Sequence, residues 1–145
     1  MGRSLSRNAL PFVAAAFVAC GVVQVFLAGL GVFDDPSAFV THREFGYAFG
    51  WLTLVVLILA LASRAPRRLV GMAVLMLVLF ALQSVFVALR ASLPAVAALH
   101  PLNGFAILAV GVLTTRVAWQ VRAGRPAVAG APRLDRSAAT GAIDA

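Results

Sequence analysis

The sequence predicts an all-α integral membrane protein, a transmembrane four-helix bundle built from two tandem helical hairpins. Of its 145 residues, 62% are hydrophobic and only 12% are charged, whereas a soluble domain carries about 25% charged residues. The apolar residues lie in four runs, each long enough to cross roughly 30 Å of hydrocarbon as a helix. None of the runs alternates like a membrane β-strand, so helices are predicted throughout.

The four apolar runs define the helices in chain order. They predict helices at Leu10–Phe33, Phe45–Ala62, Leu69–Leu89 and Leu102–Val121. Residues 1–9 form a short cytoplasmic segment before this transmembrane domain, which spans residues 10–121. Residues 122–145 are rich in Ala, Gly, Pro and Arg and predict a disordered cytoplasmic tail.

The starts of the second and fourth helices carry specific signals. T-H-R-E at residues 41–44 fits a capping box, with Thr41 as the N-cap and Glu44 reaching back, which makes His42 the first helical residue. The fourth helix begins either at Pro101 or upstream, near Ser92–Pro94. In the first case His100 lies outside the helix, because the residue before a proline avoids helical conformation.

The distribution of arginines predicts the topology. The net charge is +7, and all twelve basic residues are arginine. Ten of them lie before the first helix, between the second and third, or at and beyond the end of the fourth; only Arg43 and Arg90 lie on the other side. By the positive-inside rule both termini are cytoplasmic, in what we predict to be a bacterial inner membrane. The charge therefore indicates a lipid bilayer as partner and excludes nucleic-acid binding.

The two hairpins predict an internal duplication. Gln24 and Gln83 each lie fourteen residues after the start of their apolar runs, and His42 and His100 follow them by 18 and 17 residues. Repeats that each contain two helices run in the same sense and are related by an axis along the membrane normal. The bundle is therefore predicted to have pseudo-twofold symmetry, with both histidines at its outer face.

The two histidines are the only ones in the chain, and both stand in an H-x3-G motif. We predict that His42 and His100 ligate one b-type haem from opposite sides, since imidazole is a usual axial ligand of haem iron. Gly46 and Gly104 lie on the same helix faces as the histidines. They would leave room for the porphyrin beside each ligand.

Other polar residues surround this predicted site. Gln24 and Gln83 should face the bundle interior, because an amide is costly in hydrocarbon. They either border the cofactor or form structural hydrogen bonds with each other or with backbone carbonyls. Arg43 and Arg90 are predicted to pair with haem propionates.

Other functions are open at this point. The histidines could simply pack at the interface of a membrane scaffold or accessory subunit, or the bundle could bind a quinone or another small apolar molecule. Haem binding itself would imply a redox partner. Two histidines fall short of a zinc or copper site, and the apolar region holds no catalytic arrangement, so an enzyme is not predicted.

The layout resembles small, chiefly actinobacterial, four-helix membrane proteins of a family of unknown function. They have H-x3-G at the head of helix 2 and H-P-x-N-G at the head of helix 4, and the resemblance covers residues 10–121. T-H-R-E-F-G and H-P-L-N-G are also similar to the histidine segments of haem A synthase and cytochrome b561-like proteins. This second resemblance implies haem ligation by His42 and His100. It does not extend to oxygenase activity, because the functional acid of haem A synthase has no clear counterpart here.

Overall fold

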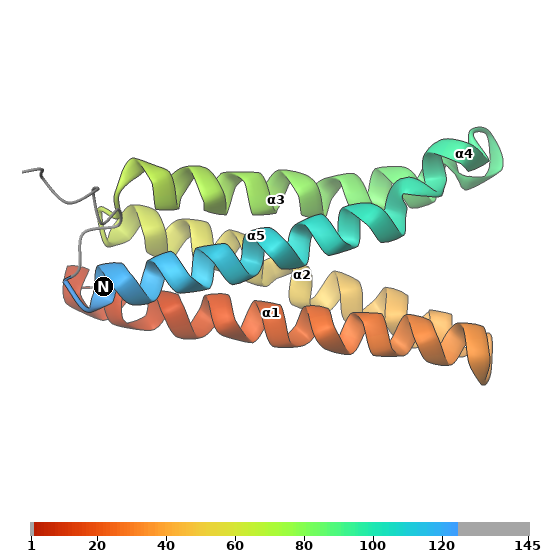
Figure 1. Cartoon of the computed structure of the whole chain (residues 1–145), viewed down its shortest axis with the longest axis horizontal. Coiled ribbons are helices and arrows are strands. Elements are labelled where there is room, and N and C mark those ends of the chain that lie inside the picture. The colour runs from red at the N-terminus through yellow and green to blue at the C-terminus, as the bar shows by residue number, and fades with distance from the viewer. Residues whose placement is uncertain (1, 125–145) are drawn as a thin grey trace, which may run out of the picture.

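The computed structural model describes residues 2–124 as a set of antiparallel helices (Figure 1). They are α1 (Arg3–Phe33), α2 (Ala38–Ala62), α3 (Arg67–Ala88), a 3-10 turn (Leu89–Ala91), the short α4 (Pro94–Ala97) and α5 (Leu99–Arg122). Within the described residues, four helical segments are long and apolar enough to cross a membrane. The predicted all-α architecture of four packed helices with membrane-span composition is confirmed.

The helices pack in the circular order α1, α2, α3, α5. Helix α1 contacts α2 and α5, and α3 contacts the same two helices, so α2 and α5 face each other across the bundle axis. Figure 1 shows the start of α1, the α2–α3 connection and the end of α5 at one end of the bundle. We call this the basic end, because it carries most of the arginines. At the opposite end, which we call the open end, the α1–α2 and α3–α5 hairpins diverge.

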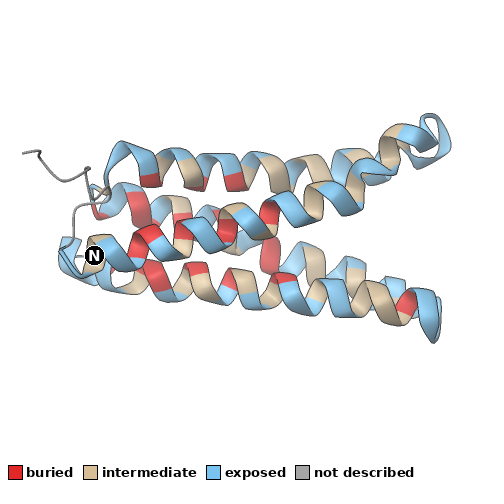
Figure 2. Ribbon diagram, viewed as in Figure 1, coloured by how far each residue is buried: buried red, intermediate tan, exposed pale blue. Residues whose placement is uncertain are grey.

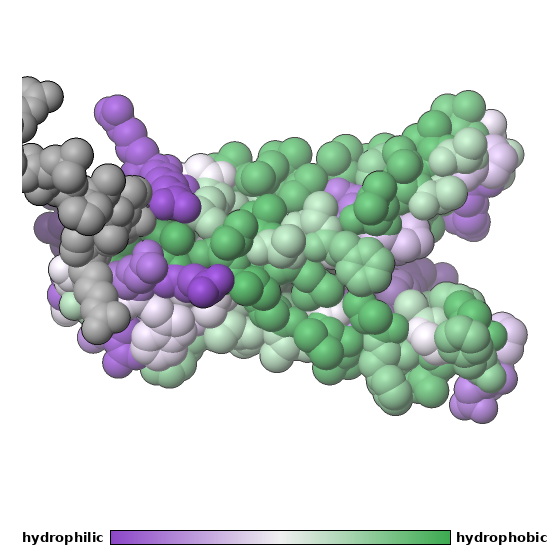
Figure 3. Space-filling model, viewed as in Figure 1, coloured by the Kyte–Doolittle hydropathy of each residue, from purple (hydrophilic) through white to green (hydrophobic). Residues whose placement is uncertain are grey.

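The outer surface of the bundle is apolar. Large hydrophobic side chains on every long helix point outward, among them Phe26, Trp51, Val78 and Leu102. Figure 3 shows hydrophobic surface along most of the length of the helices, with hydrophilic surface gathered at the two ends. Such a surface would drive a soluble protein to associate and is the surface that a bilayer requires.

All four long helices begin before their apolar runs, and the difference is largest for α1 and α2. Helix α1 starts at Arg3 rather than Leu10, and the Arg3 side chain donates a hydrogen bond to the carbonyl of Ser63, which fastens this polar first turn to the α2–α3 connection. Helix α2 starts at Ala38, with Ser37 at the N-cap position. The predicted capping box at Thr41 is therefore wrong, since Thr41 lies inside the helix.

The turn before α2 explains its early start. Asp35 accepts hydrogen bonds from the hydroxyl and the backbone N–H of Ser37, which closes the turn after α1. These two bonds hold the pKa of the Asp35 carboxyl below its usual value. Glu44, the other half of the predicted capping box, instead pairs with its neighbour Arg43. Helix formation can thus begin well before the first residue of the apolar run.

The start of α5 follows the second of the two predicted alternatives. Pro94 opens the short helix α4, and α5 begins at Leu99, so that His100 is helical. Pro101 lies in the first turn of α5, where a missing N–H costs nothing because first-turn N–H groups lack intrahelical partners. Helix α5 ends at Arg122, and the predicted disordered tail lies outside the described residues from residue 125 onward.

The core occupies the half of the bundle nearer the basic end (Figure 2). Apart from Gly31, the buried residues of α1 and α2 fall within 6–21 and 49–60. At the outward limit of this core lies an aromatic cluster, in which the rings of Phe17, Phe49 and Phe80 contact one another, with Phe45 against Phe49. Nearer the open end, beyond this cluster, packing is sparse.

Candidate functional site

His42 and His100 face each other across the bundle axis. His42 is on the first turns of α2 and His100 is the second residue of α5, two helices that occupy diagonal positions. Their ring centroids are 6.2 Å apart, with an angle of 62° between the ring planes. Both side chains are half-buried. Residues 58 positions apart in the sequence are therefore brought to one place, as the spacing of the two motifs predicts.

Each histidine is oriented by a backbone carbonyl of the preceding helix in its own hairpin. His42 Nδ1 lies 3.1 Å from the carbonyl oxygen of Gln24, and His100 Nδ1 lies 3.4 Å from that of Gln83. A carbonyl oxygen only accepts hydrogen bonds, so each Nδ1 is the donor and carries the proton. In a neutral ring the lone pair then lies on Nε2, which is the arrangement commonly found in metal-binding histidines.

The glycines of the H-x3-G motifs receive the two glutamine side chains. A Cβ at Gly46 would lie 2.6 Å from Nε2 of Gln24, and a Cβ at Gly104 would lie 3.4 Å from Nε2 of Gln83. The space that each glycine leaves is thus next to an amide of the neighbouring helix. The motif spacing predicts room for a porphyrin beside each histidine; in this structure the side chains of Gln24 and Gln83 occupy that room.

One of the differences between the two hairpins changes the hydrogen bonding of the glutamines: the residue three positions after each histidine. Asn103, three residues after His100, donates hydrogen bonds to the carbonyl of Leu79 at 2.8 Å and to Oε1 of Gln83 at 2.7 Å. The corresponding residue three positions after His42 is Phe45, which has no amide to offer. Oε1 of Gln24 is accordingly buried without a hydrogen-bond partner among the described residues.

Arg43 and Arg90, the two predicted partners of the haem propionates, lie at the open end and hydrogen-bond to neighbouring residues of their own segments. Arg43 donates two hydrogen bonds to Glu44, at 3.1 and 2.8 Å, and this ion pair is largely exposed. Arg90 donates to the carbonyl of Val87 at 3.3 Å. Neither arginine hydrogen-bonds to a histidine within residues 2–124. The aromatic ring nearest His42 on its own helix is Phe39, which meets it edge-on and packs over Gly31.

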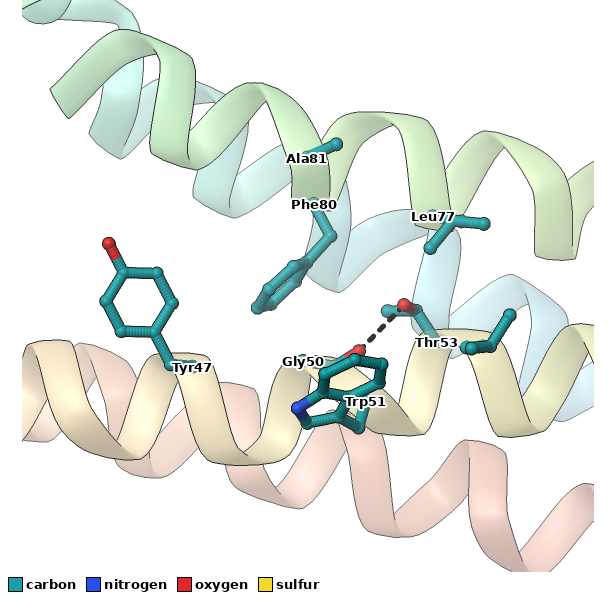
Figure 4. A pocket seen from close by; sticks show the side chains of 8 residues that line it. Tyr47, Gly50, Trp51, Thr53, Leu77, Phe80 and Ala81 are labelled. Carbon is teal, nitrogen blue, oxygen red and sulfur yellow. Dashed lines mark hydrogen bonds between the residues drawn. The ribbon is translucent and has the colours of Figure 1, made fainter. Parts of the chain in front are cut away.

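The two hairpins are separated at the open end. Figure 3 shows a cleft between the two hairpins at the open end, and the aromatic cluster lies between this end and the buried core. A separate pocket of about 380 Å³ lies between α2 and α3 and is lined mainly by apolar side chains. Tyr47 and Trp51 of α2 flank this pocket, and Phe80 points into it from α3 (Figure 4). The Thr53 hydroxyl donates a hydrogen bond to the carbonyl of Gly50.

The donor set limits which metal centres the site could hold. Within residues 2–124 there is no group of three or more His, Cys, Asp or Glu residues placed to bind a metal ion. A bare zinc ion in a structural site takes four protein ligands and in a catalytic site three. Haem iron needs only one or two, because the porphyrin supplies four nitrogens. The two histidines alone are therefore a donor set that fits haem.

Comparison with known proteins gives one match. No curated protein matches the chain, and no solved structure matches it. The resemblance to haem A synthase and cytochrome b561-like proteins therefore stays a prediction. Residues 24–91, which run from Gln24 through His42 and Gln83 to the end of the 3-10 turn, are similar to a family of unknown function, DUF6220.

Proposed function

We propose that this protein is a b-type haem-binding membrane protein in which His42 and His100 are the axial ligands, serving electron transfer or haem handling. The observation that carries the proposal is the 6.2 Å separation of the two ring centroids across the bundle axis. Two imidazoles bound to opposite sides of one iron, with metal–nitrogen bonds of about 2 Å, have their centroids about 6 Å apart. The angle between the two ring planes is free to vary about the ligation axis.

Three further features support this assignment. Both Nδ1 atoms are engaged by backbone carbonyls, which leaves Nε2 to the iron. The cleft between the hairpins lies at the open end (Figure 3), where α2 and α5 begin, so that part of the macrocycle would project beyond the helices. Among residues 2–124, Arg43 and Arg90 are the arginines at this end. They would pair with the propionates once a propionate replaces Glu44 as the partner of Arg43.

We also propose that the hairpins are duplicated units related by a pseudo-twofold axis along the membrane normal. The matched contacts support this: in each hairpin a glutamine carbonyl accepts from a histidine Nδ1, and the glutamine amide lies beside the glycine of H-x3-G. The charge distribution supports cytoplasmic termini in a bacterial inner membrane. The start of α1 and the end of α5 lie at the same end of the bundle (Figure 1).

Optical spectroscopy tests the haem assignment. We expect the protein, purified in detergent with haem supplied, to give a reduced-minus-oxidised spectrum with the Soret and α bands of a low-spin haem. His42→Ala and His100→Ala should each lose this low-spin spectrum, and added imidazole should restore it by occupying the vacated position. Circular dichroism of each variant checks that the helices are retained.

Two results would overturn the assignment. One is a wild-type protein that stays colourless after haem reconstitution, as expected of a scaffold or accessory subunit whose histidines only pack. The other is a His100→Ala variant that keeps the low-spin spectrum without added imidazole, which would leave the second histidine without a role as ligand.

The two glycines provide a further prediction, because the structure crowds them differently. Gly46→Ala puts a methyl group against the Gln24 amide and should displace that amide, whereas Gly104→Ala makes only ordinary contact with Gln83. We expect haem affinity to fall about tenfold in Gly46→Ala, a change of about 1.4 kcal/mol, and much less in Gly104→Ala. Haem titration of both variants in detergent measures the difference. Equal affinities would show that the Gln24 amide does not influence the site.

A second candidate function is binding of a quinone or another small apolar molecule. The pocket between α2 and α3 favours it, since it is lined mainly by apolar residues and carries Tyr47 and Trp51 at its rim (Figure 4). A protein that stays colourless with haem, but whose Trp51 fluorescence falls when a quinone is added, would support this candidate over haem binding.

A further inference from the structure

A narrow groove runs between α1 and α5 toward the basic end. Ala15 and Val18 of α1 and Val112 and Thr115 of α5 line it, and Arg116 closes it on one side, around a volume of about 170 Å³. The Thr115 hydroxyl donates a hydrogen bond to the carbonyl of Gly111, so it adds little polar character to the groove. The groove is therefore an apolar channel on the lipid-facing surface with a guanidinium at its margin.

Directly beyond the groove, toward the basic end, an aromatic platform holds a second guanidinium. The rings of Phe12 and Trp119 pack edge-to-face with centroids 5.0 Å apart, and Cζ of Arg122 lies 4.9 Å from each ring centroid. Arg116, Trp119 and Arg122 are three residues apart in sequence, so they follow one stripe along α5. Phe12 and Ala15 extend the same face of α1. The groove and the platform thus form one continuous surface.

The charges on this surface find no carboxylate within the protein's described part. Among residues 2–124 the acidic side chains are Asp34, Asp35 and Glu44, and all three lie at the open end. Arg116 makes no ion pair or hydrogen bond with another residue in this range. Figure 3 shows hydrophilic surface at this end bordering directly on hydrophobic surface. A guanidinium at the edge of hydrocarbon is costly unless it finds an anion or reaches water.

We propose that this surface is a binding site for one anionic phospholipid. An acyl chain lies in the groove between Ala15, Val18 and Val112, and the headgroup phosphate is bound by Arg116 and Arg122. Guanidinium groups bind phosphate through charge-assisted, often bidentate hydrogen bonds. Trp119 and Phe12 lie at headgroup depth, where aromatic side chains are enriched in membrane proteins. Basic sites between transmembrane helices commonly take anionic lipid headgroups.

Native mass spectrometry of the detergent-solubilised full chain tests the site. The probes are dioleoyl phosphatidylglycerol and dioleoyl phosphatidylethanolamine, which share acyl chains and differ in headgroup charge. We expect phosphatidylglycerol to bind with a clear preference, and Arg116→Gln to weaken its binding about fivefold, the effect of one interfacial arginine. Arg67→Gln is the matched control, because it removes the same charge at the same end of the bundle but outside the groove. It should leave the preference intact.

A second variant separates the groove from the charge. Ala15→Leu fills the groove without changing the charge, and it should lower phosphatidylglycerol binding while circular dichroism stays that of the wild type. Equal binding of the two lipids by the wild type would overturn the proposal. So would an Arg67→Gln variant that loses as much binding as Arg116→Gln, since this would indicate a diffuse charge effect. Unchanged binding in Ala15→Leu would equally count against a defined site.

Discussion

Replacing Phe17 by alanine is expected to lower the free energy of unfolding by about 3 kcal/mol or more, the largest single effect we foresee. The Phe17 side chain is fully buried, and its ring contacts those of Phe49 and Phe80. It also lies against Gly111 of α5, where an added Cβ would be 3.4 Å from the ring. One side chain thus joins all four long helices, and its removal leaves a cavity that no single neighbour can fill.

Unfolding in mixed detergent micelles, monitored by circular dichroism, measures this loss. Thermal unfolding is an alternative, in which the midpoint temperature should fall by about 10 °C. Phe26→Ala is the matched control: it is the same substitution on the same helix, but Phe26 is 63% exposed toward lipid. The control should change stability by no more than about 0.5 kcal/mol. Equal losses in the two variants would show that the aromatic cluster does not hold the bundle together.

Replacing Gly50 by alanine is expected to destabilise the fold by about 1–3 kcal/mol, although alanine is the better helix former. The new methyl group would overlap the ring of Phe80, which packs directly on the backbone of α2 at this point. A phenyl ring is rigid, so either it leaves the aromatic cluster or α2 and α3 move apart. Close approach at a small residue is the usual way in which helices pack in membranes.

Two companion variants make this result specific. Gly71→Ala has nothing within 4 Å of the new Cβ, so stability should stay constant or rise by up to about 1 kcal/mol from helix propensity alone. Adding Phe80→Leu to Gly50→Ala should recover part of the loss, because the smaller side chain relieves the overlap. If Gly50→Ala is as stable as Gly71→Ala, the described packing of α2 on α3 is incorrect.

The sequence predicted the elements that depend on local pattern. Runs of apolar residues located the four membrane-spanning helices, and the spacing of Gln24, His42, Gln83 and His100 pointed to one shared site. His42 and His100 do come together, because each lies near the start of the helix that returns from the open end in its hairpin. These features follow from hydropathy and from the regular spacing of residues along a helix, and both can be obtained from the sequence.

What the sequence did not reveal depends on contacts between distant residues or on polar helix ends. Helix α2 starts at Ala38 because Asp35 and Ser37 close a turn, a signal weaker in the sequence than the T-H-R-E motif. Asn103 is part of the H-P-x-N-G motif, but the sequence offered no reason to assign it a contact, because it aligns with Phe45 and so breaks the repeat. The sequence does carry a signal for Asn103: it is a polar residue in an apolar run, and the equivalent residue of the first hairpin, Phe45, is aromatic.

The placement of the core has a consequence for how this protein could change in evolution. Most buried side chains lie toward the basic end, while the histidines lie between hairpin ends that share little packing. Folding free energy and the chemistry of the cleft are therefore encoded by largely separate sets of residues. Substitutions around His42 and His100 should cost little stability, so the open end can change its sequence while the packed half of the bundle stays the same.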